Sequence, residues 1–406
     1  MKNLKIFSLV FFFFAFATVC DADDQLITTP IKVHVERPGN LDEQIGETKA
    51  KLITNLTLTG DLNSSDIQYL RYMAGQTRKG YSSGGNLQYL DLSDANIVYE
   101  YNKYYINEID GYNTYNNEIG KYMFYKCTFV SIKLPKTSKI IDESAFANCN
   151  NLKEVVMPDG ITVFGSGCFY ECVSLDKITM PQNLESIGDG AFCRCIRLRN
   201  IDIPKTVKEI GYDAFKGCTG LTSVNITDFN AWCDIIFYTI ESNPVYYAKH
   251  LYVNGEEIDN INIPFDITFI RWCVYCGMES LKKANIHSNV TDVGSYTFYG
   301  CKNMSEIYVH AIKPPEVGIS CFEGINKQSC TLYVPRGTYM DYFLAPGWGD
   351  FLNIVEFDAT GIDNPDLSCK PKPVDYYNIN GMKTTRQTKG LNILRMSDGT
   401  YMKTSF

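Results

Sequence analysis

The chain repeats itself with a period of 23 residues, and this period constrains its fold more than any other feature. A phenylalanine recurs at Phe146, Phe169, Phe192 and Phe215. A cysteine follows each one after three residues, and a leucine follows each cysteine after three more. A unit this short cannot bury its own apolar face. Successive units must therefore stack around one continuous core, so a chain of 406 residues need not divide into two or three globular domains.

Each repeat also has the pattern of a half-buried strand followed by a turn. The inward positions alternate with outward ones at Val155 and Met157, Ile178 and Met180, Ile201 and Ile203, and Val224 and Ile226. A period of two indicates a strand, and the proline that follows most of these pairs ends it. A glycine such as Gly188 then permits the tight turn before the next phenylalanine. Stacked coils should pair these strands in parallel, about 4.8 Å apart.

The same spacing continues in both directions and predicts about 11 strands. The further inward pairs are Leu56 and Leu58, Leu90 and Leu92, Ile132 and Leu134, Ile261 and Ile263, Ala284 and Ile286, Ile307 and Val309, and Leu332 and Val334. Between Ile226 and Ile263 the chain takes 37 residues, which predicts one enlarged coil around residues 232–255. Leu332 and Val334 are predicted to belong to the last coil, and residues 332–355 to a cap.

These motifs resemble the BspA-like leucine-rich-repeat family. The repeat AFxxCxxLxxIxIPxxVxxIG matches residues 191–211, LYVNG stands at 251–255, and LYVP at 332–335 precedes APGW at 345–348. The resemblance implies a right-handed leucine-rich-repeat solenoid, with a parallel β-sheet on one face and short turns and irregular coils on the other. It also implies export by host-associated bacteria. Some members are adhesins for host extracellular-matrix proteins, and no catalytic residues belong to the family.

The ends of the chain differ from the repeats. Pro365, Pro371 and Pro373 indicate a linker, and Asn380-Gly381 and Asp398-Gly399 are hairpin signals that predict a small C-terminal β module. We predict a signal peptide at 1–19, an N-terminal tether and start of the cap at 20–50, an N-terminal cap with irregular repeats at 51–120, a solenoid with its C-terminal cap at 121–357, a linker at 358–375 and a small β tail at 376–406.

The N-terminus has the features of an export signal. Lys2 and Lys5 precede an apolar run over residues 6–19, shorter than the roughly 20 residues that a membrane span needs. Cleavage after Ala17 would give a secreted protein. Lipid attachment at Cys20, which an acidic cluster follows, would give an outer-membrane surface lipoprotein. We expect the lipoprotein, otherwise plain secretion, with membrane contact only through this lipid anchor.

Cysteine usage and charge narrow the function further. Cys149, Cys172, Cys195 and Cys218 keep one phase of the repeat, which favours a packing role among the 15 cysteines. Bridges between stacked coils, or between Cys321 and Cys330, are the alternative. The net charge is −8 and no basic run occurs, so we expect no nucleic-acid partner.

No pattern of catalysis or cofactor binding is present. The four histidines are His34, His250, His287 and His310, and they lie in no metalloprotease or hydrolase motif. Cys273 and Cys276 have zinc-ligand spacing but lack a second pair of ligands. We therefore expect no catalytic residue, no metal and no cofactor, and we predict that the protein is not an enzyme.

Recognition is left to the surface, where two sets of residues are candidates. The outward strand positions should line the solvent face of the sheet at Asp202, Asn225, Asn262, Asn285, Tyr308 and Tyr333. A tyrosine- and asparagine-rich segment adds Tyr101, Tyr104, Tyr105, Tyr112 and Tyr115. The alternatives are an ordinary hydrated sheet and a loop that covers the N-terminal coils. We predict an adhesin-like protein that recognises a host protein, the alternative being a surface glycan-binding protein for nutrient capture.

Overall fold

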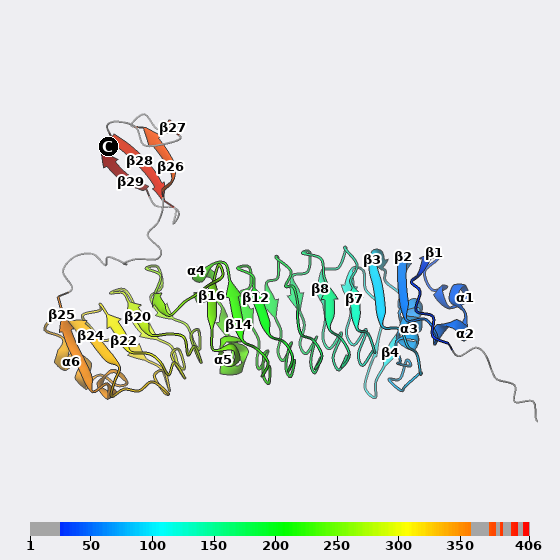
Figure 1. The fold of residues 1–406 in the computed structure, drawn as a ribbon, viewed down its shortest axis with the longest axis horizontal. Coiled ribbons are helices and arrows are strands. Elements are labelled where there is room, and N and C mark those ends of the chain that lie inside the picture. Colours follow the sequence, from blue (N-terminus) through cyan, green and yellow to red (C-terminus); the bar gives the residue numbers. More distant parts are fainter. Residues whose placement is uncertain (1–24, 359–372, 379–381, 385–390, 397–400, 406) are drawn as a thin grey trace, which may run out of the picture. The chain divides into compact units, whose positions relative to one another are not determined.

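The computed structural model describes residues 25–358, 373–378, 382–384, 391–396 and 401–405. By their contacts they fall into two compact units, one running to Ile201 with Ala214–Gly220 added, the other containing Asp202–Asp213 and the chain from Leu221 onward. Short strands paired in parallel dominate both units, as in a leucine-rich-repeat solenoid. Within the first unit, Figure 1 shows these strands side by side in chain order. None of the described helices could span a membrane. The predicted signal peptide 1–19 and Cys20 lie outside the described residues.

The first unit contains a five-stranded parallel sheet. Its order is β1 (Ile31–Val35), β2 (Asn55–Leu62), β3 (Tyr89–Ile97), β7 (Ser131–Lys133) and β9 (Glu154–Val156). The register aligns the predicted inward residues Leu56, Leu90 and Ile132 across neighbouring strands. These side chains are buried, so the two-residue alternation correctly assigned the two faces of this sheet.

Three helices and a hairpin accompany the irregular N-terminal repeats. They are α1 (Leu41–Ile45), α2 (Glu47–Ala50), α3 (Ser64–Met73) and the hairpin of β4 (Tyr105–Ile106) with β5 (Gly111–Tyr112). Helix α3 begins after Asn63, whose side chain accepts the N–H of Ser65 and Asp66 while Asp66 accepts the N–H of Asn63. This reciprocal cap satisfies the free donors at the start of the helix.

A second ladder of two-residue strands closes each coil of the first unit. It comprises β6 (Glu118–Ile119), β8 (Ile140–Ile141), β10 (Val163–Phe164) and β11 (Ser186–Ile187). Gly188 follows β11 and begins the expected turn, because its carbonyl accepts the N–H of Ala191 at 3.2 Å. A Cβ there would lie 2.7 Å from the backbone nitrogen of Ser166 in the preceding coil. Close approach of two coils requires this glycine, and the left-handed position is Gly190.

The core of the first unit is a stack of phenylalanine rings. Phe146, Phe169, Phe192 and Phe215 have no exposed surface, and their ring centroids are 5.3 to 5.4 Å apart with planes within 13° of parallel. Beside them, each repeat cysteine donates its thiol to the phenylalanine carbonyl of the preceding coil. One example is the 3.2 Å contact from Cys195 to Phe169. All 13 described cysteines are buried and unbridged, which confirms the packing interpretation and includes Cys321 and Cys330.

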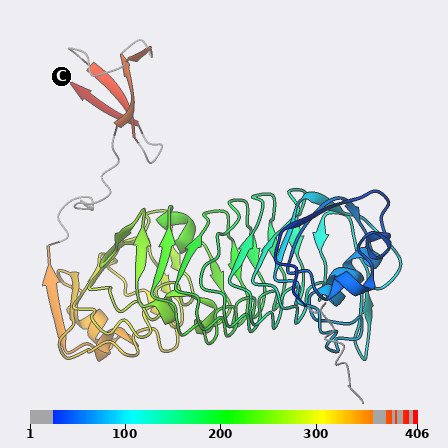
Figure 2. The same cartoon turned by 45° about the vertical axis from the view of Figure 1, so that its right-hand side comes forward.

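The second unit contains another five-stranded parallel sheet, whose last strand is the orange arrow in Figure 2. Its order is β18 (Asn260–Asn262), β20 (Lys283–Ile286), β22 (Glu306–Val309), β24 (Thr331–Pro335) and β25 (Asn353–Phe357). The short ladder strands are β13 (Glu209–Ile210), β15 (Ile236–Phe237), β19 (Phe269–Ile270), β21 (Asp292–Val293) and β23 (Glu316–Val317). The helices are α4 (Phe229–Cys233), η1 (Ile240–Ser242), α5 (Val245–Ala248), α6 (Tyr339–Leu344) and η2 (Trp348–Asp350).

Three expectations about strands were wrong. The long coil contains an extra strand, β16 (Leu251–Val253), which pairs in parallel with β14 (Ser223–Ile226) and continues into β17 (Glu256–Glu257). Residues 178–180 bury both predicted inward side chains but form no strand. β25 follows the pair that was predicted to belong to the last coil. The 23-residue period identifies which side chains are buried. It does not tell whether the backbone at those positions pairs as a strand, and it cannot predict a strand that lies outside the period.

The C-terminal β module is a four-stranded antiparallel sheet. Its order is β27 (Lys383–Thr384), β26 (Pro373–Asn378), β28 (Leu391–Met396) and β29 (Tyr401–Ser405). β26 begins inside the predicted linker 358–375, because residues 373–375 already pair with β28. The hairpin signals Asn380-Gly381 and Asp398-Gly399 lie outside the described residues.

Candidate binding surfaces

The outward strand positions of the second unit form rows of neighbouring polar side chains, as predicted. Asn225 donates its amide to the Asp202 carboxylate at 2.9 Å, and Asn285 donates to the Asn262 side chain at 2.7 Å. All four side chains are exposed or half-buried. Each of these bonds uses one amide N–H, so both pairs keep further donors and acceptors on the solvent face.

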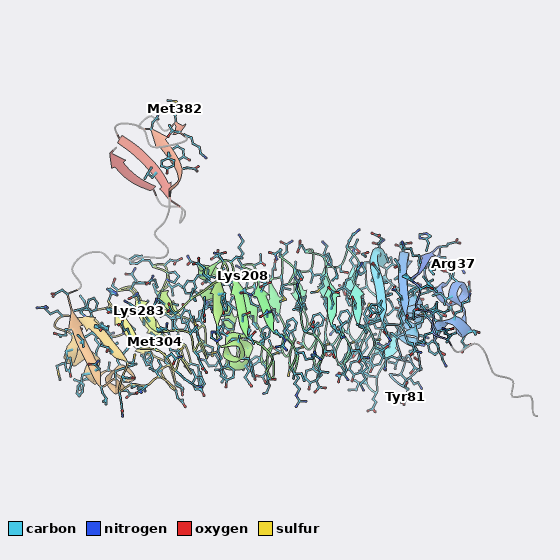
Figure 3. The ribbon with its side chains drawn as sticks, viewed as in Figure 1. Arg37, Tyr81, Lys208, Lys283, Met304 and Met382 are labelled. Atoms are coloured by element: carbon cyan, nitrogen blue, oxygen red, sulfur yellow. The ribbon has the colours of Figure 1, made fainter. Side chains whose placement is uncertain are left out.

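The row changes character on the last strands of the sheet. Tyr308 of β22 and Tyr333 of β24 are register partners, and their rings stack with centroids 4.1 Å apart and planes 9° from parallel. The ammonium of Lys283 lies 4.2 Å from the Tyr308 centroid (Lys283 is labelled in Figure 3) and 3.6 Å from the Glu306 carboxylate. Phe357 of β25 meets Tyr308 edge-on at 5.9 Å.

This packing decides which parts of the tyrosines a partner can reach. β20 and β24 flank β22 on opposite sides, so Lys283 and Tyr333 cover opposite faces of the Tyr308 ring. Burial, reinforced by Glu306 and Tyr333, raises the pKa of Tyr308 to about 12, so its hydroxyl stays protonated at neutral pH. Both tyrosines are half-exposed, but the two ring faces that stack on each other are closed to a ligand. A sugar would need an open ring face, whereas a protein surface can use edges and hydroxyls.

Two of the tyrosines predicted to face a ligand are buried, which corrects the prediction for Tyr104 and Tyr105. Tyr104 has no exposed surface and donates its hydroxyl to the Lys121 carbonyl at 2.7 Å, and burial raises its pKa. The Tyr105 ring lies 4.5 Å from the guanidinium carbon of Arg71 on α3. The β4–β5 hairpin turns both side chains inward, so they hold the loop in place.

Of the remaining tyrosines of this segment, one packs against other rings and the others are exposed to solvent. Tyr112 is half-buried in a ring stack with Tyr105 and Tyr122. Tyr101 is 78% exposed and Tyr115 is 52% exposed. Tyr99 begins the same tyrosine- and asparagine-rich segment, is 54% exposed and contacts Tyr115 with ring centroids 5.8 Å apart.

The backbone around the exposed tyrosines is fixed by hydrogen bonds. The N–H of Tyr99 donates to the Asn116 side chain at 2.7 Å. The Glu100 carboxylate accepts the N–H of Ser65 at the start of α3 at 2.9 Å. Tyr99, Tyr101 and Tyr115 are therefore presented on an ordered segment, which lowers the entropy that binding would cost.

The residues that sequence inspection weighed for metal or catalytic chemistry have structural roles. His34 bonds to the Thr59 hydroxyl, His287 to the Pro264 carbonyl, and His250 to Glu257. Cys276 is fully buried, and burial raises the pKa of its thiol. Within the described part of the chain, no group of three metal-ligating side chains comes together.

The repeats match a known family model. The model for the BspA-type leucine-rich-repeat region matches residues 117–243 and 245–337 in 6 copies, more than half of the chain. The chain belongs to the BspA-type leucine-rich-repeat family. The matched region contains the Tyr308–Tyr333 pair.

Solved structures of other bacterial leucine-rich-repeat proteins are similar to this chain. The protein from T. pallidum is 25% identical, with 46% of this chain and 71% of that chain covered and a TM-score of 0.29. A Bacteroides ovatus protein is 17% identical over 76% of this chain and 85% of that chain, with a TM-score of 0.37. A leucine-rich cell surface protein from Faecalibacterium prausnitzii is 17% identical over 62% and 86%, with a TM-score of 0.26. The search of curated proteins gives no match.

Proposed function

We propose that this BspA-type protein is a non-enzymatic, surface-displayed binding protein that recognises a host protein through the aromatic end of its outward strand row. The stacked pair Tyr308 and Tyr333 carries the proposal. Inward positions make the core and the polar outward pairs bond to each other, so the fold does not need aromatic rings on its solvent face. Tyrosine is enriched where proteins bind one another, because it combines apolar area with a hydrogen-bonding hydroxyl.

Display on the bacterial surface follows from the N-terminal sequence. The apolar run over residues 6–19 would direct export, and Cys20 would carry the lipid that anchors the protein. Metabolic labelling with a palmitate analogue tests this step in the native bacterium. Label should appear in the wild-type protein and vanish in Cys20→Ala. Unlabelled protein in the culture medium would mean cleavage after Ala17 and plain secretion.

A second candidate function rests on the loop tyrosines. Tyr99, Tyr101 and Tyr115 are half to four-fifths exposed, and Tyr99 and Tyr115 meet at 46° and so leave much of their ring faces open. Open aromatic faces can stack on sugars, which favours glycan binding for nutrient capture at this position. The two candidates thus use different residues, and one experiment can separate them.

The experiment is a binding screen of residues 26–406 against immobilised extracellular-matrix proteins and a glycan array. We expect saturable binding to a matrix protein at about 1 µM or tighter, roughly −8 kcal/mol, weakened at least tenfold by Tyr308→Ser with Tyr333→Ser. Tyr89→Ser is the matched control, because Tyr89 is 44% exposed on a strand of the first unit.

The outcomes distinguish the alternatives. Glycan binding that is lost only when Tyr99, Tyr101 and Tyr115 become serine would replace the protein-recognition proposal with the glycan one. Protein binding that survives the Tyr308 and Tyr333 changes would place the site elsewhere. The absence of binding to either class would reject both functions. Unchanged circular dichroism spectra of the variants would exclude unfolding as the cause of a loss.

A further inference from the structure

The strand β25 ends its sheet with one side free among the described residues. β24 pairs with it in parallel, and the N–H of Arg336 donates to the Phe357 carbonyl at 3.0 Å. Backbone groups of successive strand residues point to opposite sides. Phe357 and Val355 therefore direct their backbone groups toward β24, and Ile354 and Glu356 direct theirs toward the open side. In Figure 1, β25 is the outermost strand of this sheet.

The edge lacks the protection that the edge strand of the first unit has. β1 carries Lys32 and His34 and is followed by Glu36 and Arg37, and charges at a sheet edge discourage further pairing. The charged residues of β25 and directly after it are Glu356, whose carboxylate accepts the N–H groups of Gly337 and Tyr339 at 2.9 and 3.0 Å, and Asp358, which pairs with Arg336. Both carboxylates are held by residues 336–339 and do not guard the edge.

Apolar side chains surround this edge. Six of the large exposed apolar residues among those described fall within residues 339–355, and they are Tyr339, Met340, Phe343, Leu344, Leu352 and Val355. Leu352, immediately before β25, is 74% exposed. Val355 is the register partner of Tyr333, so the apolar edge continues the aromatic row of Tyr308 and Tyr333.

We propose that β25 is a docking edge that accepts an extended segment of the partner protein as an additional strand of this sheet. The proposal rests on the proposed function and names the element of the partner that is recognised. The N–H and C=O groups of Ile354 and Glu356 face no partner strand among the described residues. They recur at every second residue, which matches the backbone of another strand and not a sugar or a helix. An apolar side chain of that segment would pack beside Val355 and Leu352.

The test uses the full chain and a phage-displayed library of short linear peptides. Selected peptides are synthesised with single N-methyl groups at successive positions, which removes one backbone donor at a time without touching the protein. We expect affinity to fall about tenfold or more at every second position and to stay unchanged between them. In hydrogen exchange, the amides of Ile354 and Glu356 should exchange at least about tenfold more slowly when the peptide is bound.

A matched pair of protein variants tests the docking edge in a second way. Val355→Lys gives β25 the charge that β1 has and should abolish peptide binding, whereas Val355→Thr keeps the branched shape and should retain it. Val355 is 39% exposed, so both variants should keep the melting temperature of the wild type.

Other results would overturn the docking edge. If N-methylation leaves the affinity of the peptide unchanged at every position, the peptide binds through its side chains alone. If the library yields no binding peptide, the proposal of a peptide partner loses its support. Slow exchange at Ile354 and Glu356 in the free chain would mean that the edge is already covered, by a second copy if light scattering gives a dimer and by the chain itself if it gives a monomer. A matrix protein that still needs Tyr308 and Tyr333 would leave the proposed function standing in each case.

Discussion

Replacing Phe169 with alanine should remove one of the largest single contributions to the stability of the first unit. Phe169 has no exposed surface, and the parallel rings of Phe146 and Phe192 lie 5.4 Å away on either side, with Phe164 edge-on at 5.6 Å. Truncation of a buried phenylalanine costs about 3–5 kcal/mol. Because the neighbouring rings belong to coils held by their own backbone ladders, the void cannot collapse. We therefore expect a loss in the upper part of that range.

Urea unfolding of the full chain, followed by circular dichroism, measures the loss, and hydrogen exchange locates it. Contacts in a stacked array reach only adjacent coils, so exchange should accelerate around residues 140–200 and stay unchanged in β18–β25. Phe169→Leu is the control, with an expected cost near 1.5 kcal/mol because most of the volume is kept. A cost for Phe169→Ala no larger than that of the leucine variant would refute the ring stack as the core. Equal acceleration of exchange throughout the chain would refute local coupling.

Three further predictions concern single groups. Burial raises the pKa of Cys172 to about 12, so native protein at pH 8 should leave this thiol unreactive toward Ellman's reagent, and fast reaction would contradict its buried position. Partial burial would raise the pKa of Asp91, but hydrogen bonds from Ser93 and Lys133 outweigh it and the pKa is lowered. Asp91→Asn should therefore cost up to about 1 kcal/mol at pH 7, a difference that fades as pH falls through the Asp91 pKa, and a pH-independent cost would contradict the ion pair. Tyr104→Phe should cost about 1 kcal/mol in urea unfolding and leave ligand affinity unchanged. Weaker ligand binding by Tyr104→Phe would mean that Tyr104 contacts the ligand after all.

The repeat could be predicted in detail because one residue type at a fixed phase reports one environment. Phe192, Cys195 and Leu198 were each assigned to the core from their spacing, and each is buried. Gly188 was also predicted from its place before a turn, but it is the close approach of the preceding coil that leaves no room for a side chain there. The spacing in the sequence shows that a position is constrained. The physical cause of the constraint is seen only in the contacts with the neighbouring coil.

The departures from the repeat could not be predicted in the same way. Leu251 of β16 pairs with Val224 of β14, and the two residues are 27 positions apart in the sequence. A search at the fixed period of 23 residues therefore misses β16. Tyr104 and Tyr105 share their composition with exposed recognition loops. Tyr105 packs against Arg71, which lies on a helix more than 30 residues earlier in the chain, and Tyr104 bonds to Lys121, which lies 17 residues later. Such long-range contacts leave no local pattern in the sequence.

The positions that make the fold and the positions that could make the function are therefore separate. A change at Phe169 or Cys195 disturbs a stack that runs through several coils. A change at Tyr308 or Val355 alters a half-exposed side chain whose loss leaves the backbone ladder intact. Recognition on such a scaffold can be altered with little loss of stability. For the same reason the repeat sequence alone carries no record of the ligand, and the ring stack on β22 and β24 and the open edge of β25 have to be examined directly.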